Sequence, residues 1–313
     1  MYDKLYASLY RIRRVEETVA RVYPTEKIKS PVHLSIGQES IAVGVCEALS
    51  LQDAVFGTYR SHAAYLAKGG DLKAMIAELY GKSTGCSKGK GGSMHLFAPA
   101  VNCFGTSAVV GTTIPHGVGY AYAMKLLHRK TITVVFFGDG ATDEGVYHES
   151  LNFAALKQLP VIFVCENNGY AIHTHFSRRQ STPLLCERAR TYGMPAERID
   201  DGDVLRIHEC VSAMVKQLRA GQLGPFYLEC LTYRWKEHVG PNDDWQLGYR
   251  MPAEAALWKA TDQVTRVAAL IEPSRRFEIE QAVEAEIEAA FAFAEASPFP
   301  DVAQLWADVY KEG

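Results

Sequence analysis

The chain has 313 residues, 48% of them apolar, and a formal net charge of −3. Its Lys and Arg are dispersed among Asp and Glu, which argues against a nucleic-acid-binding surface, and its longest apolar runs are too short to cross a bilayer. The seven cysteines are scattered without any Cys-x-x-Cys pair, and the first residues show neither a signal nor a transit peptide, so we expect reduced thiols in a cytoplasmic protein.

Helical periodicity dominates the first part of the chain. Residues 3–22 place apolar side chains at helical spacing between Arg and Glu, which predicts an amphipathic helix. A polar connector then leads to a second helical stretch at 37–51. Beyond it the sequence predicts a short strand, two further helices and a glycine-dense loop, at residues 56–59, 61–68, 71–80 and 81–95.

Strands and helices alternate in the middle of the chain. The predicted strands are nearly continuous runs of Val, Ile, Phe and Leu, the pattern of a parallel sheet that helices cover on both faces. The strands are expected at residues 131–137, 161–165 and 226–233, and the helices at 115–127, 146–157 and 204–219. From residue 252 onward the pattern is helical again.

The predicted fold class is therefore α/β: a mostly parallel sheet with helices on both faces and helical N- and C-terminal extensions. We expect a single domain over residues 1–313. Within it, residues 1–55 form the N-terminal helical extension, 56–250 the α/β core and 251–313 the C-terminal helices.

Two of the predicted strands end abruptly at polar groups. The first runs into Asp139, which stands between two glycines, and the second runs into a glutamate and two asparagines, the last of which is Asn168. Because consecutive parallel strands present their carboxyl ends at one edge of a sheet, Asp139 and Asn168 should share a crevice. Their hard oxygen donors suit Mg²⁺, and the backbone amides of Gly140 and Ala141 at the start of the next helix suit an anion. The pattern predicts a metal-bridged diphosphate, although either motif alone is a common turn.

The succession of Gly-Asp-Gly, helix, strand and Asn-Asn resembles the fingerprint of thiamine diphosphate enzymes. Other motifs follow in the order expected of one branch of them: HLSIGQE (33–39), TYRSH (58–62), AELYGKSTGCSKGKGGSMH (77–95), NNGYAI (167–172) and LTYR (231–234). Together they resemble the α subunit of the thiamine-dependent 2-oxo acid dehydrogenases, the branch that covers pyruvate, branched-chain and acetoin dehydrogenases.

The resemblance implies a thiamine diphosphate-binding fold with thiamine diphosphate and Mg²⁺ as cofactors. It implies three metal ligands: Asp139, Asn168 and the main-chain carbonyl of Tyr170. The implied cofactor-binding residues are Tyr59 and Arg60 at the terminal phosphate, Arg234 and His238 above the diphosphate, and Ala108 and Val110 at the aminopyrimidine ring. A guanidinium fork suits a phosphate, which agrees with the implied role of Arg60.

Three histidines are candidates for catalysis. His33 and His62 match histidines near the thiazolium ring in pyruvate-type members, and His238 is the third candidate. Imidazole titrates near neutrality, so it can donate to a carbonyl or enolate oxygen as charge develops there. For His33 and His62 a purely structural, hydrogen-bonded role is the alternative.

The chain lacks a candidate for the glutamate that activates the pyrimidine ring, which a β subunit supplies in split members of the family. We therefore expect a β subunit as partner, in an α₂β₂ heterotetramer, and possible delivery of the acyl group to a lipoyl-bearing acyltransferase.

Two departures from the family's sequence pattern leave the identity of the substrate undetermined. Residues 30–32 lack the aromatic residue of pyruvate-type members, and Val239 stands where regulated members carry a phosphorylated serine. Two alternatives remain: a carboligase that transfers the acyl anion to an aldehyde or ketone, and a non-enzymatic binding subunit.

Overall fold

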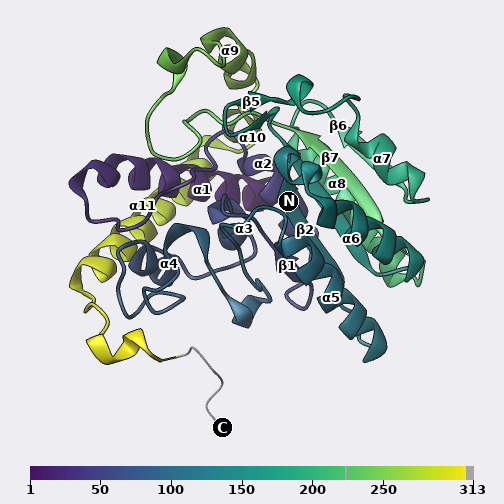
Figure 1. The fold of residues 1–313 in the computed structure, drawn as a ribbon. Helices are drawn as coiled ribbons and strands as arrows, with labels where there is room; N and C mark the ends of the chain where they lie inside the picture. Colours follow the sequence, from purple (N-terminus) through teal and green to yellow (C-terminus); the bar gives the residue numbers. More distant parts are fainter. Residues whose placement is uncertain (223, 308–313) are drawn as a thin grey trace.

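A five-stranded parallel sheet with the strand order β1-β2-β3-β7-β6 forms the centre of the protein (Figure 1). The computed structural model describes residues 1–222 and 224–307. The strands of the sheet are β1 (Ala54–Phe56), β2 (Thr133–Gly138), β3 (Val161–Asn167), β6 (Ala196–Ile199) and β7 (Phe226–Leu231). A separate antiparallel hairpin consists of β4 (Tyr170–Ala171) and β5 (Thr174–His175). The predicted α/β class with a parallel sheet is confirmed.

Helices bury both faces of the sheet, and the side chains of each strand alternate between two apolar cores. Phe136 and Val164 belong to one core, whereas Val135 and Phe163 belong to the other. The helices of the first core are α1 (Tyr2–Val22), α2 (Glu39–Cys46), α3 (His62–Ala67), α4 (Leu72–Leu79), α8 (Val204–Arg219) and α11 (Pro273–Ala296). The helices of the second core are α5 (Thr113–Leu126), α6 (Gly145–Leu156) and α7 (Leu185–Thr191).

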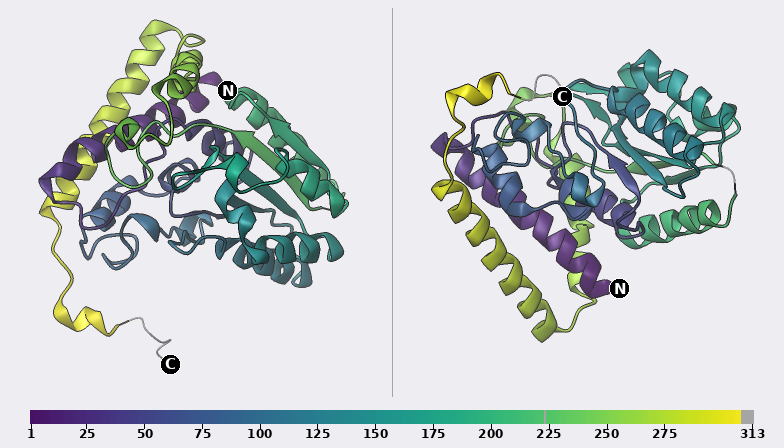
Figure 2. Two further views of the ribbon diagram at one scale, coloured as in Figure 1. Left: turned by 45° about the horizontal axis from the view of Figure 1, so that its top comes forward. Right: turned by 90° about the horizontal axis from the view of Figure 1, so that it is seen from below.

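The helices from the two ends of the chain lie against each other. Figure 2 shows α1 and α11 side by side along one edge of the molecule. Charged pairs join them across this contact, such as Arg11 with Glu286 at 2.7 Å. The shorter helices α9 (Pro252–Ala260) and α10 (Gln263–Ala268) precede α11. The helical N- and C-terminal regions predicted from the sequence are thus confirmed. Within the described residues, no helix is both long and apolar enough to cross a membrane.

Several predicted boundaries differ from the structure. The short strand expected at 56–59 is instead β1, which ends at Phe56, because the amide of Gly57 bonds to Gly105 O at 3.0 Å and draws the chain out of the sheet. The helix expected at 37–51 is confined to α2. Strand β6 was not predicted, since Glu197 and Arg198 interrupt the apolar pattern at this edge of the sheet.

The glycine-dense loop folds around a single buried carboxylate. Glu78, near the end of α4, is completely buried. Its Oε2 accepts hydrogen bonds from the amides of Ser87 and Gly89 at 2.8 and 2.9 Å, and its Oε1 accepts from Gly91 and Gly92 at 2.7 and 3.0 Å. A carboxylate that satisfies four backbone donors fixes a segment whose described residues contain only the short 3₁₀ helix η2 (Gly92–Met94) as a regular element.

We expect Glu78→Ala to lower the free energy of unfolding by about 3 kcal/mol, because it removes four charge-assisted hydrogen bonds whose donors water satisfies only in part. Glu278→Ala is the matched control, since Glu278 pairs with Arg275 on an exposed helix face. Urea denaturation measures both variants. Equal stability of the two variants would contradict the role of Glu78 as the anchor of the loop.

Candidate active site

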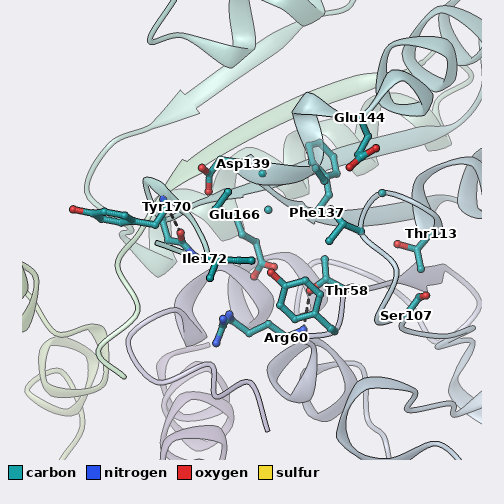
Figure 3. A pocket seen from close by; sticks show the side chains of 18 of the residues that line it. Thr58, Arg60, Ser107, Thr113, Phe137, Asp139, Glu144, Glu166, Tyr170 and Ile172 are labelled. Carbon is teal, nitrogen blue, oxygen red and sulfur yellow. Dashed lines mark hydrogen bonds between the residues drawn. The ribbon is translucent and has the colours of Figure 1, made fainter. Parts of the chain in front are cut away.

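A cavity of about 240 Å³ lies at the carboxyl ends of β2 and β3 (Figure 3). The strands pair in parallel with Gly138 opposite Glu166, so the residues that follow them reach the same edge of the sheet. Asp139 and Asn168 both line this cavity, as do Gly140, Ala141 and Tyr170. The structure therefore brings together the residues that the two strand-end motifs contribute.

Asp139 begins the 3₁₀ helix η4 (Asp139–Asp143) and is almost completely buried. Burial raises the pKa of its carboxyl to about 6, while Arg179 and a backbone hydrogen bond from Asn168 act in the opposite direction. Arg179 reaches over from the segment after η5 (Phe176–Arg178), bonds to Asp139 Oδ2 and contacts Asp143 at 2.5 Å. Sequence reasoning missed Arg179, because nothing in the sequence marks it as a partner of the carboxylate.

The two asparagines at the end of β3 have different contacts. Asn167 turns to the sheet, where its Nδ2 donates to Glu229 Oε1 at 2.8 Å. Asn168 faces the cavity, its Nδ2 donates to Gln38 Oε1 at 3.0 Å, and its Oδ1 accepts from the amide of Tyr170 at 3.1 Å. The phenol ring of Tyr170 points away from the cavity (Figure 3), and its hydroxyl donates to Glu254 Oε2 at 2.8 Å. This residue therefore contributes its backbone to the cavity.

Gly140 and Ala141 shape the floor of the cavity. A Cβ atom at Gly140 would lie 2.9 Å from the Cβ of Ala171, so only glycine permits η4 to approach the β4 strand this closely. Ala141 follows it and is buried. The backbone at this point is therefore able to approach a ligand without an intervening side chain.

The wall opposite Asp139 carries the cation Arg60. Its Nη1 donates to Leu34 O and its Nη2 to His238 O, both at 2.8 Å. Burial lowers its pKa to about 10, which still leaves it charged at neutral pH. Tyr59, beside it, also lines the cavity. The cavity thus has a carboxylate end and a guanidinium end.

Glu166 is a cavity residue that sequence reasoning did not assign. It is the last buried residue of β3 before the asparagines, and its carboxyl points into the cavity toward Arg60 (Figure 3). Burial raises its pKa to about 7, and the charge of Arg60 opposes that shift. The sequence feature that could have identified Glu166 is its position directly before Asn167, at the end of a buried strand.

His33 and His238 form an aromatic cluster with Tyr59 behind the cavity wall. The ring of His33 lies 4.6 Å from that of Tyr59 and 5.2 Å from that of His238, measured between centroids. Burial and the neighbouring Arg60 lower the pKa of each imidazole to about 3. Among the described residues, none pairs with the buried Nδ1 of His33. Both rings are therefore neutral at physiological pH, with polar atoms beside Arg60.

His62 lies elsewhere. It is completely buried, with Nδ1 2.9 Å from Glu16 Oε1 and Nε2 2.8 Å from Ser93 Oγ. These contacts tie α3 to α1 and to the glycine-dense loop, which is the hydrogen-bonded alternative considered for this residue. His62 does not line the cavity.

Comparison with known proteins identifies the family. The family model of the dehydrogenase E1 component matches residues 7–303. The chain belongs to this family. The α subunit of acetoin:2,6-dichlorophenolindophenol oxidoreductase from Bacillus subtilis is 35% identical over an alignment of 322 positions that covers 98% of this chain and 92% of the relative. Subunit alpha-3 of the chloroplastic pyruvate dehydrogenase E1 component of Arabidopsis thaliana is 37% identical over 99% of this chain and 74% of the relative. Subunit alpha of the Zymomonas mobilis pyruvate dehydrogenase E1 component is 36% identical over 98% and 87%.

In this member of the dehydrogenase E1 family, the loop at 236–250 is closed by buried charges. Asp244 is fully buried and bonds to Arg250, with Nε–Oδ1 at 2.8 Å, and to Tyr249. Burial acts to raise the pKa of Asp244, but Tyr249, Arg250 and Arg234 outweigh it and hold the pKa below its ordinary value. Arg234 itself is fully buried and donates to Lys236 O and Ile172 O. It does not line the cavity, although the sequence placed it above a diphosphate.

The two positions expected at an aminopyrimidine ring lie on an exposed segment. Ala108 is exposed, and Val110 is 42% exposed and lines the cavity mouth together with Val109 and Gly111. The left-handed backbone of Gly111, with φ +79°, ends this segment before α5. The backbone of Val109, Val110 and Gly111 thus lies at the mouth of the cavity, whereas Ala108 does not line it.

We expect His33 and His238 to contribute a loss of stability as the pH drops below about 6.5, because these histidines bind protons there in the unfolded chain, whereas their buried rings in the folded protein do not. The loss continues toward pH 3, where the folded rings also protonate. The double variant His33→Gln/His238→Gln lacks this contribution, so the wild-type free energy of unfolding minus that of the double variant should decrease as the pH falls from about 6.5 to 4. Urea titrations at a series of pH values measure this slope.

The difference in stability between the wild type and the double variant isolates the contribution of His33 and His238. Asp139 and Glu166 have raised pKa values, so they stabilise the folded state increasingly as pH falls through about 7 to 4, and they do so in both proteins. Parallel stability curves for wild type and double variant would contradict the neutral state of the two rings.

Proposed function

We propose that this chain is the α subunit of a thiamine diphosphate- and Mg²⁺-dependent dehydrogenase that decarboxylates a 2-oxo acid and transfers the acyl group to an acceptor. The observation that carries the proposal is the pairing of Asp139 and Asn168 at adjacent strand ends, in one cavity with the buried cation Arg60. The relatives named pyruvate dehydrogenase E1 component subunit alpha support a dehydrogenase over a carboligase.

The residues present fit the two cofactors. A carboxylate and an amide oxygen at one end of the cavity are the ligands that Mg²⁺ prefers, and the main-chain carbonyl of Tyr170 would complete the protein's share. The backbone at Gly140 and Ala141 and the side chains of Tyr59 and Arg60 would hold the phosphates. The backbone at Ala108 and Val110 would hold the aminopyrimidine ring. His238, through the carbonyl that Arg60 binds, links this cation to the loop above it.

Thiamine diphosphate, when bound, supplies the carbanion chemistry that decarboxylation of a 2-oxo acid requires. The protein's own residues bind and orient. Arg60 would neutralise phosphate charge, and the neutral rings of His33 and His238, which lie behind the cavity wall, would donate a hydrogen bond to a substrate carbonyl oxygen that reaches this cluster, as negative charge develops on it. His62 would act only through the segment that it holds.

The proposed assembly includes a β subunit that supplies the activating glutamate, in an α₂β₂ heterotetramer, with a lipoyl-bearing acyltransferase as the acyl acceptor. The name subunit alpha shared by the relatives supports a β partner. We propose a cytoplasmic location, which the seven free thiols of the chain support.

Asp139→Ala should abolish Mg²⁺-dependent thiamine diphosphate binding in the folded protein, because it removes the charged metal ligand. Asn168→Ala should weaken binding less, because it removes a neutral ligand. Asp143→Ala is the matched control, since it also removes a carboxylate bonded to Arg179. Calorimetric titration of cofactor with and without Mg²⁺ measures all three. Unchanged affinity in a folded Asp139→Ala variant would refute the metal assignment.

Turnover should require the partner. We expect no decarboxylation of any 2-oxo acid by the purified chain and measurable turnover after co-expression with the β subunit encoded by the same organism. A panel of 2-oxo acids, assayed with an artificial electron acceptor and with a lipoyl domain, identifies substrate and acceptor. Robust turnover by the chain alone would mean that it contains its own activating carboxylate.

A further inference from the structure

Gln38 is a buried cavity residue that holds the amide of Asn168. Its Oε1 accepts the hydrogen bond from Asn168 Nδ2 at 3.0 Å. At the other end of the same amide, Asn168 Oδ1 accepts from the backbone N–H of Tyr170 at 3.1 Å. A backbone N–H can only donate, so the Tyr170 contact identifies the carbonyl oxygen, and Gln38 receives the amino group.

This arrangement decides what Asn168 presents to a cation. A carbonyl oxygen has two lone pairs, and Tyr170 takes only one of them. If the amide turned over, its amino group would replace the oxygen and would repel a metal ion. We propose that Gln38 is a positioning residue that fixes the orientation of the Asn168 amide and so presents its oxygen to the metal. This inference rests on the metal site of the proposed function.

The turn that carries Gln38 is itself rigid. Its backbone N–H donates to Ser35 O at 2.8 Å. Gly37 has a φ of +93°, and a Cβ there would lie 2.4 Å from the Trp235 ring, so the turn fits closely against the segment after β7. Thr232 donates to Gly37 O at 3.2 Å. The backbone at Gln38 is therefore anchored independently of Asn168.

A buried ion cluster anchors the same turn to the terminal helices. Glu39 Oε2 accepts from the amide of Gly37 at 3.0 Å, and Glu39 Oε1 lies 2.5 Å from Arg13 Nε of α1. Arg13 also contacts Asp262, which caps the N-terminus of α10, at 2.9 Å. Because a buried ion pair is costly to break, α1 and α10 hold the turn in place. The terminal helices thus reach the metal site through Gln38.

The test compares substitutions of Gln38 in the assembled α/β protein, with Mn²⁺ binding followed by electron paramagnetic resonance and cofactor binding by calorimetry. Gln38→Met keeps the length of the side chain but has no acceptor comparable to an amide oxygen, and it should weaken metal binding roughly 10–100-fold, the scale for residues that orient a ligand. Gln38→Glu keeps an acceptor and should retain binding. If Gln38→Met does not fold, Gln38→Asn, whose amide is too short to reach Asn168, takes its place.

A double-mutant cycle separates orientation from general damage. In an Asn168→Asp background the two carboxylate oxygens are equivalent, so the orientation no longer matters, and Gln38→Met should add little further loss. If Gln38→Met weakens metal binding roughly 10–100-fold in the Asn168→Asp background too, the positioning role is overturned. Weak binding by Asn168→Ala together with normal binding by Gln38→Met would overturn only this inference. Unchanged binding by Asn168→Ala would overturn the metal assignment and the inference together.

Discussion

The parallel pairing of β2 with β3 is the constraint on which the site depends. Six aligned pairs run from Thr133 opposite Val161 to Gly138 opposite Glu166. Both faces of these strands are buried in different cores, so a slip by one residue would exchange the side chains of the two cores. The register therefore sets the separation of Asp139 and Asn168 through the core, before any loop contact is made. The sheet defines the end of the cavity that holds Asp139 and Asn168, and burial there raises the pKa of Asp139 to about 6, so that a cation bound as proposed would compete with protons for this carboxylate.

Loops at the edge of a parallel sheet have no neighbouring strand to satisfy their backbone groups, and in this protein buried charges take that role. Glu78 holds the glycine-dense loop, Asp244 holds the loop that carries His238, and Glu39 holds the turn that carries Gln38. Each carboxylate accepts backbone or guanidinium donors inside the protein, where such hydrogen bonds are strong and their loss is costly. Of these three segments, the turn with Gln38 lines the cavity, so a buried carboxylate supports the cavity wall directly at that point.

The sequence was sufficient to predict the regular alternation of strands and helices. Apolar runs with abrupt polar ends predicted the parallel sheet and the shared crevice of Asp139 and Asn168, because strand direction and crossover handedness follow general rules. It was insufficient for β6, whose polar residues Glu197 and Arg198 obscure a strand that pairs with β7 at the edge of the sheet. Gln38 and Arg179 were also missed. Gln38 meets Asn168 from 130 positions away, and no periodicity in either segment signals that contact. For Arg234 the resemblance supplied a role, but Asp244 and its neighbours bury the guanidinium outside the cavity.

These observations separate two kinds of contribution to one site. Position along the sheet comes from the strands, whereas the orientation of individual donors comes from contacts made by distant segments. An asparagine at a strand end is placed by the sheet but can present either end of its amide, and only a second polar group decides which. Arg60 is a similar case, since Leu34 O and His238 O fix the plane of its guanidinium from two other segments. Segments outside the sheet, among them the turn with Gln38 that α1 and α10 anchor, therefore contribute contacts that orient the polar groups at the strand ends.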